Sequence, residues 1–237
     1  MGFELMDSDI KNQILKLVEE ITPTDDLEHE HIDNTIQWIK SGAELFRIQK
    51  PEIPPKHLVS YFVIVDPDKN KILLIDHIKA QLWLPAGGHV EPNEHPKTTV
   101  EREVVEELNT QADFLYDGIF FLTQAVTVGL TAGHTDVSLW YVLQGDSNTP
   151  LQYDSGEFNG YKWFSPEEIL EIPIEKLDPH LHRFVKKWMN YSGISSNCLE
   201  KLRQDTLIAS TGASTRLAGS KLSDEEVEQI SKPSVQK

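Results

Sequence analysis

Residues 83–110 read WLPAGGHVEPNEHPKTTVEREVVEELNT, and this stretch decides the fold. It leaves a predicted strand through two adjacent glycines, Gly87 and Gly88, crosses a polar segment, and enters a helix predicted over about residues 97–108. The glycines predict a tight loop whose backbone can approach a ligand closely, because neither residue carries a Cβ atom. Two prolines stiffen the lead into the helix, so the order is strand, loop, helix.

Three glutamates share one face of this predicted helix. Glu103, Glu106 and Glu107 are three and four residues apart, so at about 100° per residue they span roughly a third of the circumference. We expect the neighbouring apolar face to pack on a sheet and hold the carboxylates toward a cleft. The residues of that apolar face are Val100, Val104, Val105 and Leu108.

The carboxylate face needs a cation. Like charges at this spacing destabilise a helix by about a few tenths of a kcal/mol per pair, and a divalent ion removes that conflict. Oxygen ligands without His or Cys among them favour Mg²⁺, or Mn²⁺, over zinc, and such ions typically bridge protein carboxylates to substrate phosphates. The pattern therefore indicates phosphate chemistry.

The same stretch resembles the box of the MutT-like Nudix family, G-x5-E-x7-R-E-U-x-E-E-x-G-U, in which U is a bulky aliphatic residue. The positions that match in register are Gly88, Glu94, Arg102, Glu103, Val104, Glu106 and Glu107. Asn109 replaces the box's glycine and Thr110 its last aliphatic residue. Because Asn tolerates the left-handed conformation that ends a helix, we expect this departure to leave the metal ligands unchanged. The resemblance implies an α/β/α sandwich around a mixed sheet.

The resemblance also implies the metal ligands. It makes Glu103 and Glu107 direct ligands and Glu106 a ligand or a water-mediated partner. The backbone carbonyl of Gly87 would complete the coordination of one ion. The ion expected is Mg²⁺, with Mn²⁺ as a substitute.

The reaction implied is that of a nucleotide pyrophosphatase, in which metal-activated water attacks one phosphorus of a nucleoside diphosphate-linked substrate and breaks its phosphoanhydride bond. Arg102 and Glu94 would brace the ligands and complete the catalytic set. The general base stays open between a box glutamate, Asp136 and Glu157. The substrate stays open among nucleoside triphosphates, including oxidised ones, ADP-ribose and dinucleoside polyphosphates.

Apolar periodicity and turn residues divide the chain into a helical lead-in (1–50), a Nudix domain (51–191) and a flexible or partly helical tail (192–237). The helices expected in the lead-in cover about residues 6–20 and 27–45, the second of them broken near Gly42. The strands expected in the domain cover residues 57–66, 71–77, 114–128, 135–143 and 161–164. A short helix capped by Ser165 and a longer one over 177–191 follow.

The tail carries a second, weaker resemblance, to the Fic-family segment that contains an inhibitory helix motif. Ser214 is followed after three residues by Ala218 and Gly219, so the motif's glutamate is missing. A truncated fusion and a flexible tail both fit, and we favour the tail, with a marginal helix near residues 223–230.

Composition restricts location and partners. The chain has 237 residues, one cysteine and a formal net charge of −16. It contains no apolar stretch long enough for a membrane span, and the single Cys198 cannot form an internal disulfide, so we expect a cytoplasmic protein. The charge disfavours nucleic acid, and we expect a small-molecule nucleotide as substrate. The sequence leaves a homodimer open.

Other functions give different signals. A Nudix-like domain that binds a nucleotide as a sensor would show broken box carboxylates, and these are intact. An isomerase on this fold would need a catalytic cysteine or equivalent acid, which we do not find. Seven histidines show no grouping typical of metal binding, and we interpret them as structural. They are His29, His31, His89, His95, His134, His180 and His182.

Overall fold

The computed structural model describes residues 2–50 and 53–191 of the chain. Contacts divide the chain into two units, Met1–Val185 and Lys186–Lys237, and both the sheet and the site belong to the first. The Fic-like segment and the marginal helix expected near 223–230 lie outside the described residues. Among those described, no helix has the length and apolar character that crossing a membrane requires.

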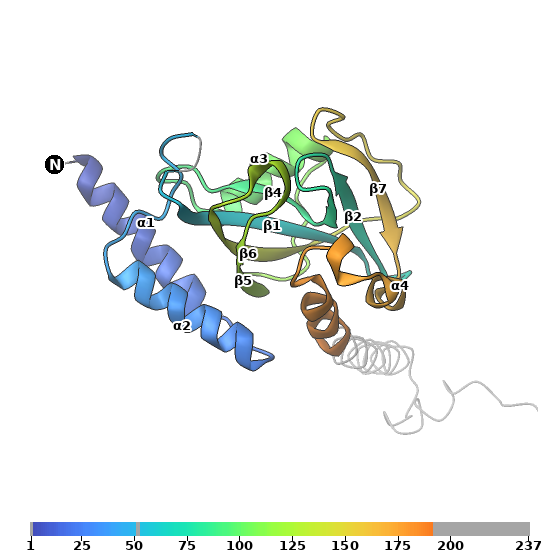
Figure 1. Ribbon diagram of the computed structural model, residues 1–237, viewed down its shortest axis with the longest axis horizontal. Coiled ribbons are helices and arrows are strands. Elements are labelled where there is room, and N and C mark those ends of the chain that lie inside the picture. Colours follow the sequence, from blue (N-terminus) through green and yellow to red (C-terminus); the bar gives the residue numbers. More distant parts are fainter. Residues whose placement is uncertain (1, 51–52, 192–237) are drawn as a thin grey trace, which may run out of the picture. The chain divides into compact units, whose positions relative to one another are not determined.

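Two antiparallel-packed helices open the chain (Figure 1). They are α1 (Gly2–Glu19) and α2 (Asp26–Lys40), close to the two helices expected in the lead-in. The Asp25 side chain caps α2 by accepting a hydrogen bond from the Glu28 N–H. Gln124 binds α2 to the sheet, because its side-chain amide donates to Thr35 Oγ1 over 2.9 Å. The lead-in is therefore packed onto the domain.

The centre of the domain is a seven-stranded sheet. Its strands are β1 (Lys56–Asp66), β2 (Lys71–His77), β3 (Leu82–Leu84), β4 (Ala86–His89), β5 (Phe121–Val126), β6 (Thr135–Gln144) and β7 (Phe158–Phe164). The main path runs β3-β2-β1-β6-β5, with β4 beside β1 and β7 beside β2. The pairing of β1 with β6 is parallel and all other strand pairs are antiparallel, so the prediction of a mixed sheet is confirmed.

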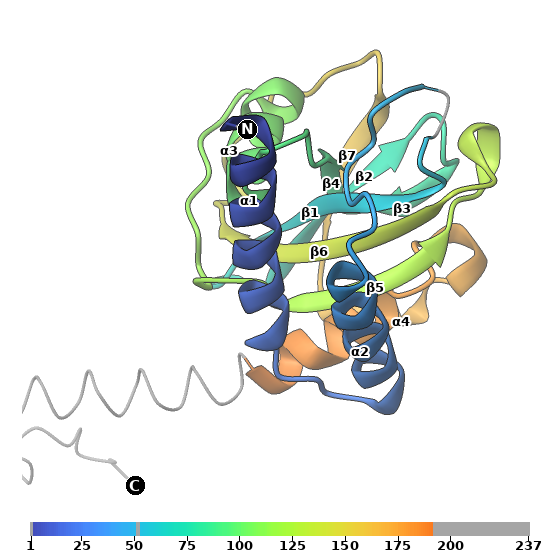
Figure 2. The ribbon, with the colours of Figure 1, turned by 90° about the vertical axis from the view of Figure 1, so that its left-hand side faces the viewer.

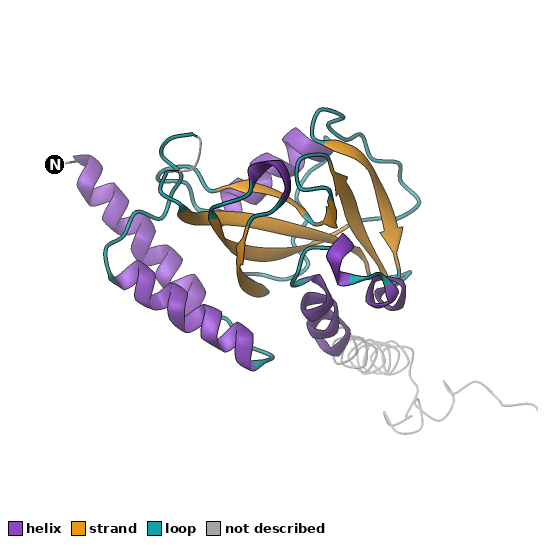
Figure 3. Cartoon of the chain, viewed as in Figure 1, coloured by secondary structure: helices purple, strands orange, loops and turns teal. Residues whose placement is uncertain are grey.

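Helices cover both faces of this sheet, which gives the α/β/α sandwich that the resemblance implied (Figures 2 and 3). On one face, apolar residues of α1 and α3 (Pro96–Leu108) join those of the central strands in one buried cluster. On the other face, Phe184, in the helical residues 181–185, stacks on Trp140 with ring centroids 5.3 Å apart. The remaining helices are α4 (Pro166–Glu171), η1 (Gly129–Thr131) and η2 (Ile174–Lys176).

Four local predictions need correction. Gly87 and Gly88 form no loop; they lie in β4, which pairs with Ser60 and Tyr61 of β1. The strand expected over 114–128 is confined to β5, because the chain turns at residues 115–118. The helix expected from residue 177 begins at 181, after a turn. Val105 is half exposed, because the buried stripe of α3 follows the i, i+4 spacing of the other three apolar residues.

Candidate metal centre

A cavity of about 570 Å³ lies where the sheet divides. β1 pairs with β2 only at Val65 and Asp66, and farther back along β1 its neighbour is β4. The wall of the cavity therefore includes residues from both sides of the division, Ile75 and His77 of β2 and Val59 and Tyr61 of β1. The sheet topology creates a space next to the glycine strand.

Helix α3 brings the predicted carboxylates to this cavity. Glu103, Glu106 and Glu107 all line it, as does Gly87. Glu107 is buried and the Glu103 side chain is 13% exposed, whereas the Glu106 side chain is 59% exposed. On this face of α3, the Glu107 carboxylate therefore lies deepest in the cavity and the Glu106 carboxylate lies at its mouth.

Glu107 is held by the glycine strand. Its Oε2 accepts a hydrogen bond from the Gly87 N–H over 3.1 Å. Gly87 has φ 148°, and a Cβ there would overlap the carbonyl oxygen of Ser60, so only glycine fits this approach. Burial, then the charges of Glu103 and Glu157, raise the pKa of Glu107 to about 9. A positive charge close to Glu107 would lower this pKa.

Glu103 lies directly over Gly88. A Cβ at Gly88 would overlap the Glu103 carboxylate, so the glycine makes room for that side chain. Burial raises the pKa of Glu103, although the neighbouring Arg102 opposes the rise. Each of the two adjacent glycines therefore serves a different glutamate of α3: Gly87 donates a hydrogen bond to Glu107, and Gly88 leaves space for Glu103.

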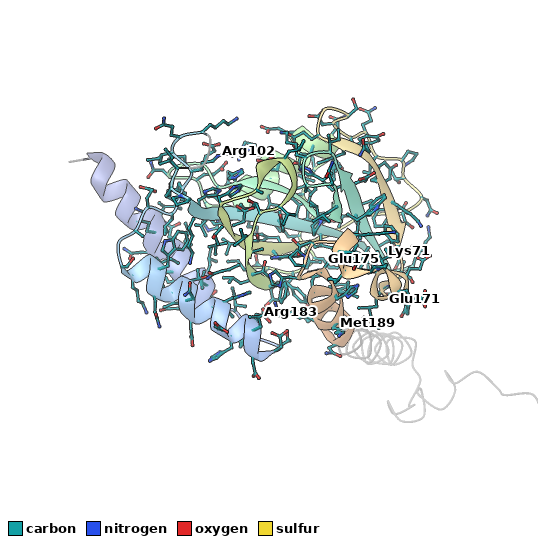
Figure 4. All side chains as sticks on the ribbon, in the orientation of Figure 1. Lys71, Arg102, Glu171, Glu175, Arg183 and Met189 are labelled. Atoms are coloured by element: carbon teal, nitrogen blue, oxygen red, sulfur yellow. The ribbon has the colours of Figure 1, made fainter. Side chains whose placement is uncertain are left out.

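Arg102 connects Glu94, which lies outside the cavity, to two of the glutamates that line it (Figure 4 labels the position of Arg102). Its guanidinium donates to both oxygens of Glu94 over 3.1 Å and to Glu103 Oε1 over 2.7 Å, and it reaches Glu106 Oε2 at 3.4 Å. A further bond goes to the carbonyl oxygen of His89. Burial acts to raise the pKa of Glu94, but the hydrogen bonds from Arg102 and Thr99 hold it below its ordinary value. Arg102 and Glu94 do not line the cavity; they position residues that do.

These residues fit a magnesium or manganese centre. Three carboxylates from one helix face converge on a cavity, and the two less exposed ones have raised pKa values because of burial and mutual repulsion. A divalent cation supplies the charge that would keep both ionised. The ends of α3 support the placement: His95 Nδ1 accepts from the Lys97 N–H, and Asn109 takes the left-handed conformation expected of it, with φ 46°.

Both acidic residues considered as a general base, Asp136 and Glu157, also line the cavity. Glu157 forms an ion pair with Lys79 at 3.6 Å. Asp136 lies instead in a group of histidines. Asp178, which is buried, forms another part of the wall, and burial raises its pKa to about 7.

The histidine group corrects an interpretation made from the sequence. His57, His89, His134 and Asp136 each offer one ligand atom, and these atoms all lie within 4.8 Å of one another. Two of the histidines interpreted as structural, His89 and His134, therefore belong to a potential ligand set, together with His57, which the sequence pattern did not indicate. The available signal was His134-x-Asp136 at the start of one predicted strand with His57 at the start of another, but one sequence does not give the register between strands.

Comparison with known proteins identifies the family. The NUDIX domain model matches residues 56–188, more than half of the chain. The chain therefore belongs to the Nudix family, as the box and the fold indicated. It is a Nudix hydrolase, an enzyme that acts on pyrophosphate bonds.

Three similar proteins illustrate the relationship. A MutT-like protein of Streptomyces ambofaciens is 27% identical over 127 residues, which cover 54% of this chain and 76% of that one. The CTP pyrophosphohydrolase of Escherichia coli strain K12 is 33% identical over 108 residues, which cover 45% and 73%. The crystal structure of a NUDIX-family hydrolase from Clostridium perfringens is 21% identical with a TM-score of 0.45, covering 57% of this chain and 97% of that one.

Proposed function

We propose that this chain hydrolyses a phosphoanhydride bond of a nucleoside diphosphate-linked small molecule and depends on Mg²⁺, with Mn²⁺ as a substitute. The observation that carries the proposal is the convergence of Glu103, Glu106 and Glu107 on one cavity. Magnesium would neutralise phosphate charge and lower the pKa of a bound water. The intact carboxylates favour this reading over a sensor that binds a nucleotide without turning it over.

The proposed role of each glutamate follows from how deeply its side chain is buried. Glu107 and Glu103 would hold the metal from the interior, and Glu106 would hold it, directly or through water, at the mouth. The carbonyl of Gly87 is proposed as a further ligand. Arg102, fixed by Glu94, would keep Glu103 and Glu106 in place and reduce their repulsion.

In the reaction, a water oxygen forms a bond to phosphorus as the bridging P–O bond breaks, and the leaving phosphate keeps the electron pair. The proton leaves to a base on the cavity wall. Glu157 is one candidate, because it lines the cavity and its charge acts on both Glu103 and Glu107. We keep a box glutamate and Asp136 as the others.

The substrate is tested directly. We would incubate the full chain with CTP, other nucleoside triphosphates including oxidised ones, ADP-ribose and dinucleoside polyphosphates, each with Mg²⁺, Mn²⁺ or a chelator. CTP comes first because a relative is named a CTP pyrophosphohydrolase. Chromatographic separation of the products should show Mg²⁺-dependent turnover of at least one compound. Tight binding of one compound without turnover of any compound would show instead that the protein is a nucleotide sensor.

We further propose that the protein acts in the cytoplasm without nucleic acid or membrane partners, in line with its net charge of −16 and single cysteine. A homodimer stays open, and light scattering at several concentrations decides it. Binding of single- or double-stranded DNA or RNA at physiological salt would contradict the nucleic acid part.

A further inference from the structure

We propose that His57, His89, His134 and Asp136 form a second metal site, which binds one zinc-like transition-metal ion and is separate from the glutamate centre. Three of the four residues lie in strands that are neighbours in the sheet, His57 in β1, His89 in β4 and Asp136 in β6, and His134 directly precedes β6. Their ligand atoms lie within 4.8 Å of one another, and all four residues are buried or half-buried.

Strand register explains why these residues meet. His57 of β1 is directly opposite Asp136 of β6 in the parallel pair. His134 comes two residues before Asp136, and His89 ends β4, opposite Val59. The imidazole of His57 is 4.9 Å from that of His134 and 4.8 Å from that of His89, between ring centroids. Three rings and a carboxylate therefore surround one point of the cavity wall.

The outer nitrogens of two rings fix which nitrogen faces inward. His57 Nδ1 lies 2.9 Å from the carbonyl oxygen of Pro54, which can only accept, so a neutral His57 carries its proton on Nδ1. His134 Nδ1 lies 3.1 Å from Thr127 Oγ1. Thr127 can direct its own proton to the His134 carbonyl oxygen, 3.2 Å away, and then accept from His134 Nδ1. With both outer nitrogens protonated in this way, Nε2 of both rings keeps a lone pair.

These lone pairs face a carboxylate. His57 Nε2 is 3.4 Å and His134 Nε2 is 3.1 Å from the same atom, Asp136 Oδ1. In a neutral cluster, electron-pair donors face each other inside the protein, an arrangement that either a bound proton or a metal ion resolves. Outward bonds that fix an imidazole tautomer are also the usual support of metal-binding histidines.

The donor set selects the kind of metal. Imidazole nitrogens suit zinc and similar transition metals, whereas Mg²⁺ takes oxygen ligands. Metal–ligand bonds of about 2.1 Å in a tetrahedron put ligand atoms roughly 3.4 Å apart, and the two His–Asp contacts already have about that separation. Small movements of the other side chains would bring all four ligand atoms to the separations of a tetrahedral site.

The position gives the ion a structural role. His89 directly follows Gly88, and its carbonyl accepts from Arg102. An ion held by His89, His57 and Asp136 would clamp the glycine strand to β1 and β6. It would thereby hold the surface on which Glu103 and Glu107 rest. Apart from Asp136, which is also one of the candidates for the general base, this inference concerns other residues than the proposed reaction, and the metal measurement below does not depend on turnover.

Metal content tests the proposal. The full chain, stripped with a chelator, would be loaded with Zn²⁺ in excess Mg²⁺, freed of unbound metal, and measured by mass spectrometry. We expect about one zinc per chain, as for a closed four-ligand site. His134→Gln should lose most of it, whereas Glu107→Gln should keep it. His77→Gln is the matched control, because His77 lines the same cavity outside the cluster.

A second measurement needs no variant and so remains decisive if His134→Gln fails to fold. X-ray absorption of the zinc-loaded wild type should show a four-coordinate ion with imidazole scattering, and chelation should lower its Tm by several degrees. Wild type without stoichiometric zinc, zinc retained in folded His134→Gln, or a spectrum without imidazole would each overturn the proposal.

Discussion

The backbone N–H of Gly87 donates a hydrogen bond to Oε2 of Glu107 over 3.1 Å. This bond joins the backbone of β4 to the most buried carboxylate of α3. A glutamine at position 107 could accept the same hydrogen bond without a negative charge. The relationship therefore allows the charge of Glu107 to be tested apart from its packing.

Glu107→Gln should lower kcat/KM at least about 100-fold, because the deepest proposed metal ligand loses its charge. Its Tm without metal should stay equal or rise, since burial opposes the charged carboxylate. Steady-state kinetics and thermal unfolding measure the two effects. Glu101→Gln, on the exposed side of the same helix, is the control and should change neither. Full activity in Glu107→Gln would refute the assignment.

Gly88→Ala should reduce kcat about 10–100-fold, because the new Cβ must displace the Glu103 carboxylate and misplaced catalytic groups act much more slowly. Its effect on Tm should be small, since the end of a flexible side chain can move. Gly160→Ala in β7 is the control, because a Cβ there meets no atom within 4 Å among the described residues. Equal kcat in the two variants would show that Glu103 needs no such space.

Asp178→Asn should stabilise the protein at high pH. A carboxyl whose pKa is raised on folding, here to about 7, binds its proton more tightly when folded. That stability is fully present below about pH 4 and is lost as the pH rises through 7. Asparagine avoids the loss and can still accept the hydrogen bond from the His180 N–H.

For Asp178→Asn we expect the free energy of unfolding to rise by roughly 2 kcal/mol at pH 8.5 and to change little at pH 4. Urea unfolding of wild type and variant at both pH values, in chelator, measures this difference. The same effect at both pH values would show that the burial of the charge does not cause it.

Asp25→Asn should weaken the ion pair with Arg183 while keeping the helix cap. Hydrogen bonds from Arg183, 2.6 and 2.9 Å long, lower the pKa of Asp25 to about 2, despite a contrary effect of burial. A lowered pKa gives stability that is present above about pH 4 and is lost as the pH falls through 2. Because Asp25 is largely exposed, we expect a loss below about 1 kcal/mol at pH 7.

That loss should be mostly gone at pH 2, where Asp25 is half protonated in the folded protein, and it should shrink in 1 M salt, where exposed charges are screened. Thermal unfolding across pH and salt would show it. Asp26→Asn is the control, because it removes an exposed charge from the same end of α2. If both variants lose the same stability, the helix dipole rather than Arg183 explains the effect of Asp25.

Features that depend on near neighbours in the sequence could be predicted. The carboxylate face of α3 follows from helical spacing, and the left-handed Asn109 from its place after the last helical turn. The capping box of Ser165 and Glu168 at the start of α4 is equally local. Each of these depends on residues within one or two turns of backbone, so one sequence contains the necessary information.

Features that depend on pairing between distant segments could not be predicted. Gly87 and Gly88 look like a loop until β1 supplies a partner strand. The histidine group could not be predicted for the same reason, because His57 and Asp136 become neighbours only through the register of β1 and β6. Neither register nor partner is encoded in a local pattern.

The parallel pairing of β1 and β6 has a consequence for how the domain folds. Every paired position is 79 residues from its partner, from Lys56 with Thr135 to Val65 with Gln144. The central strand therefore stays without its main neighbour until synthesis has passed residue 144. Contacts of such long range slow folding and leave apolar strands open to aggregation on the ribosome. Nascent chains that stop short of β6 should depend on chaperones, whereas the completed domain should not.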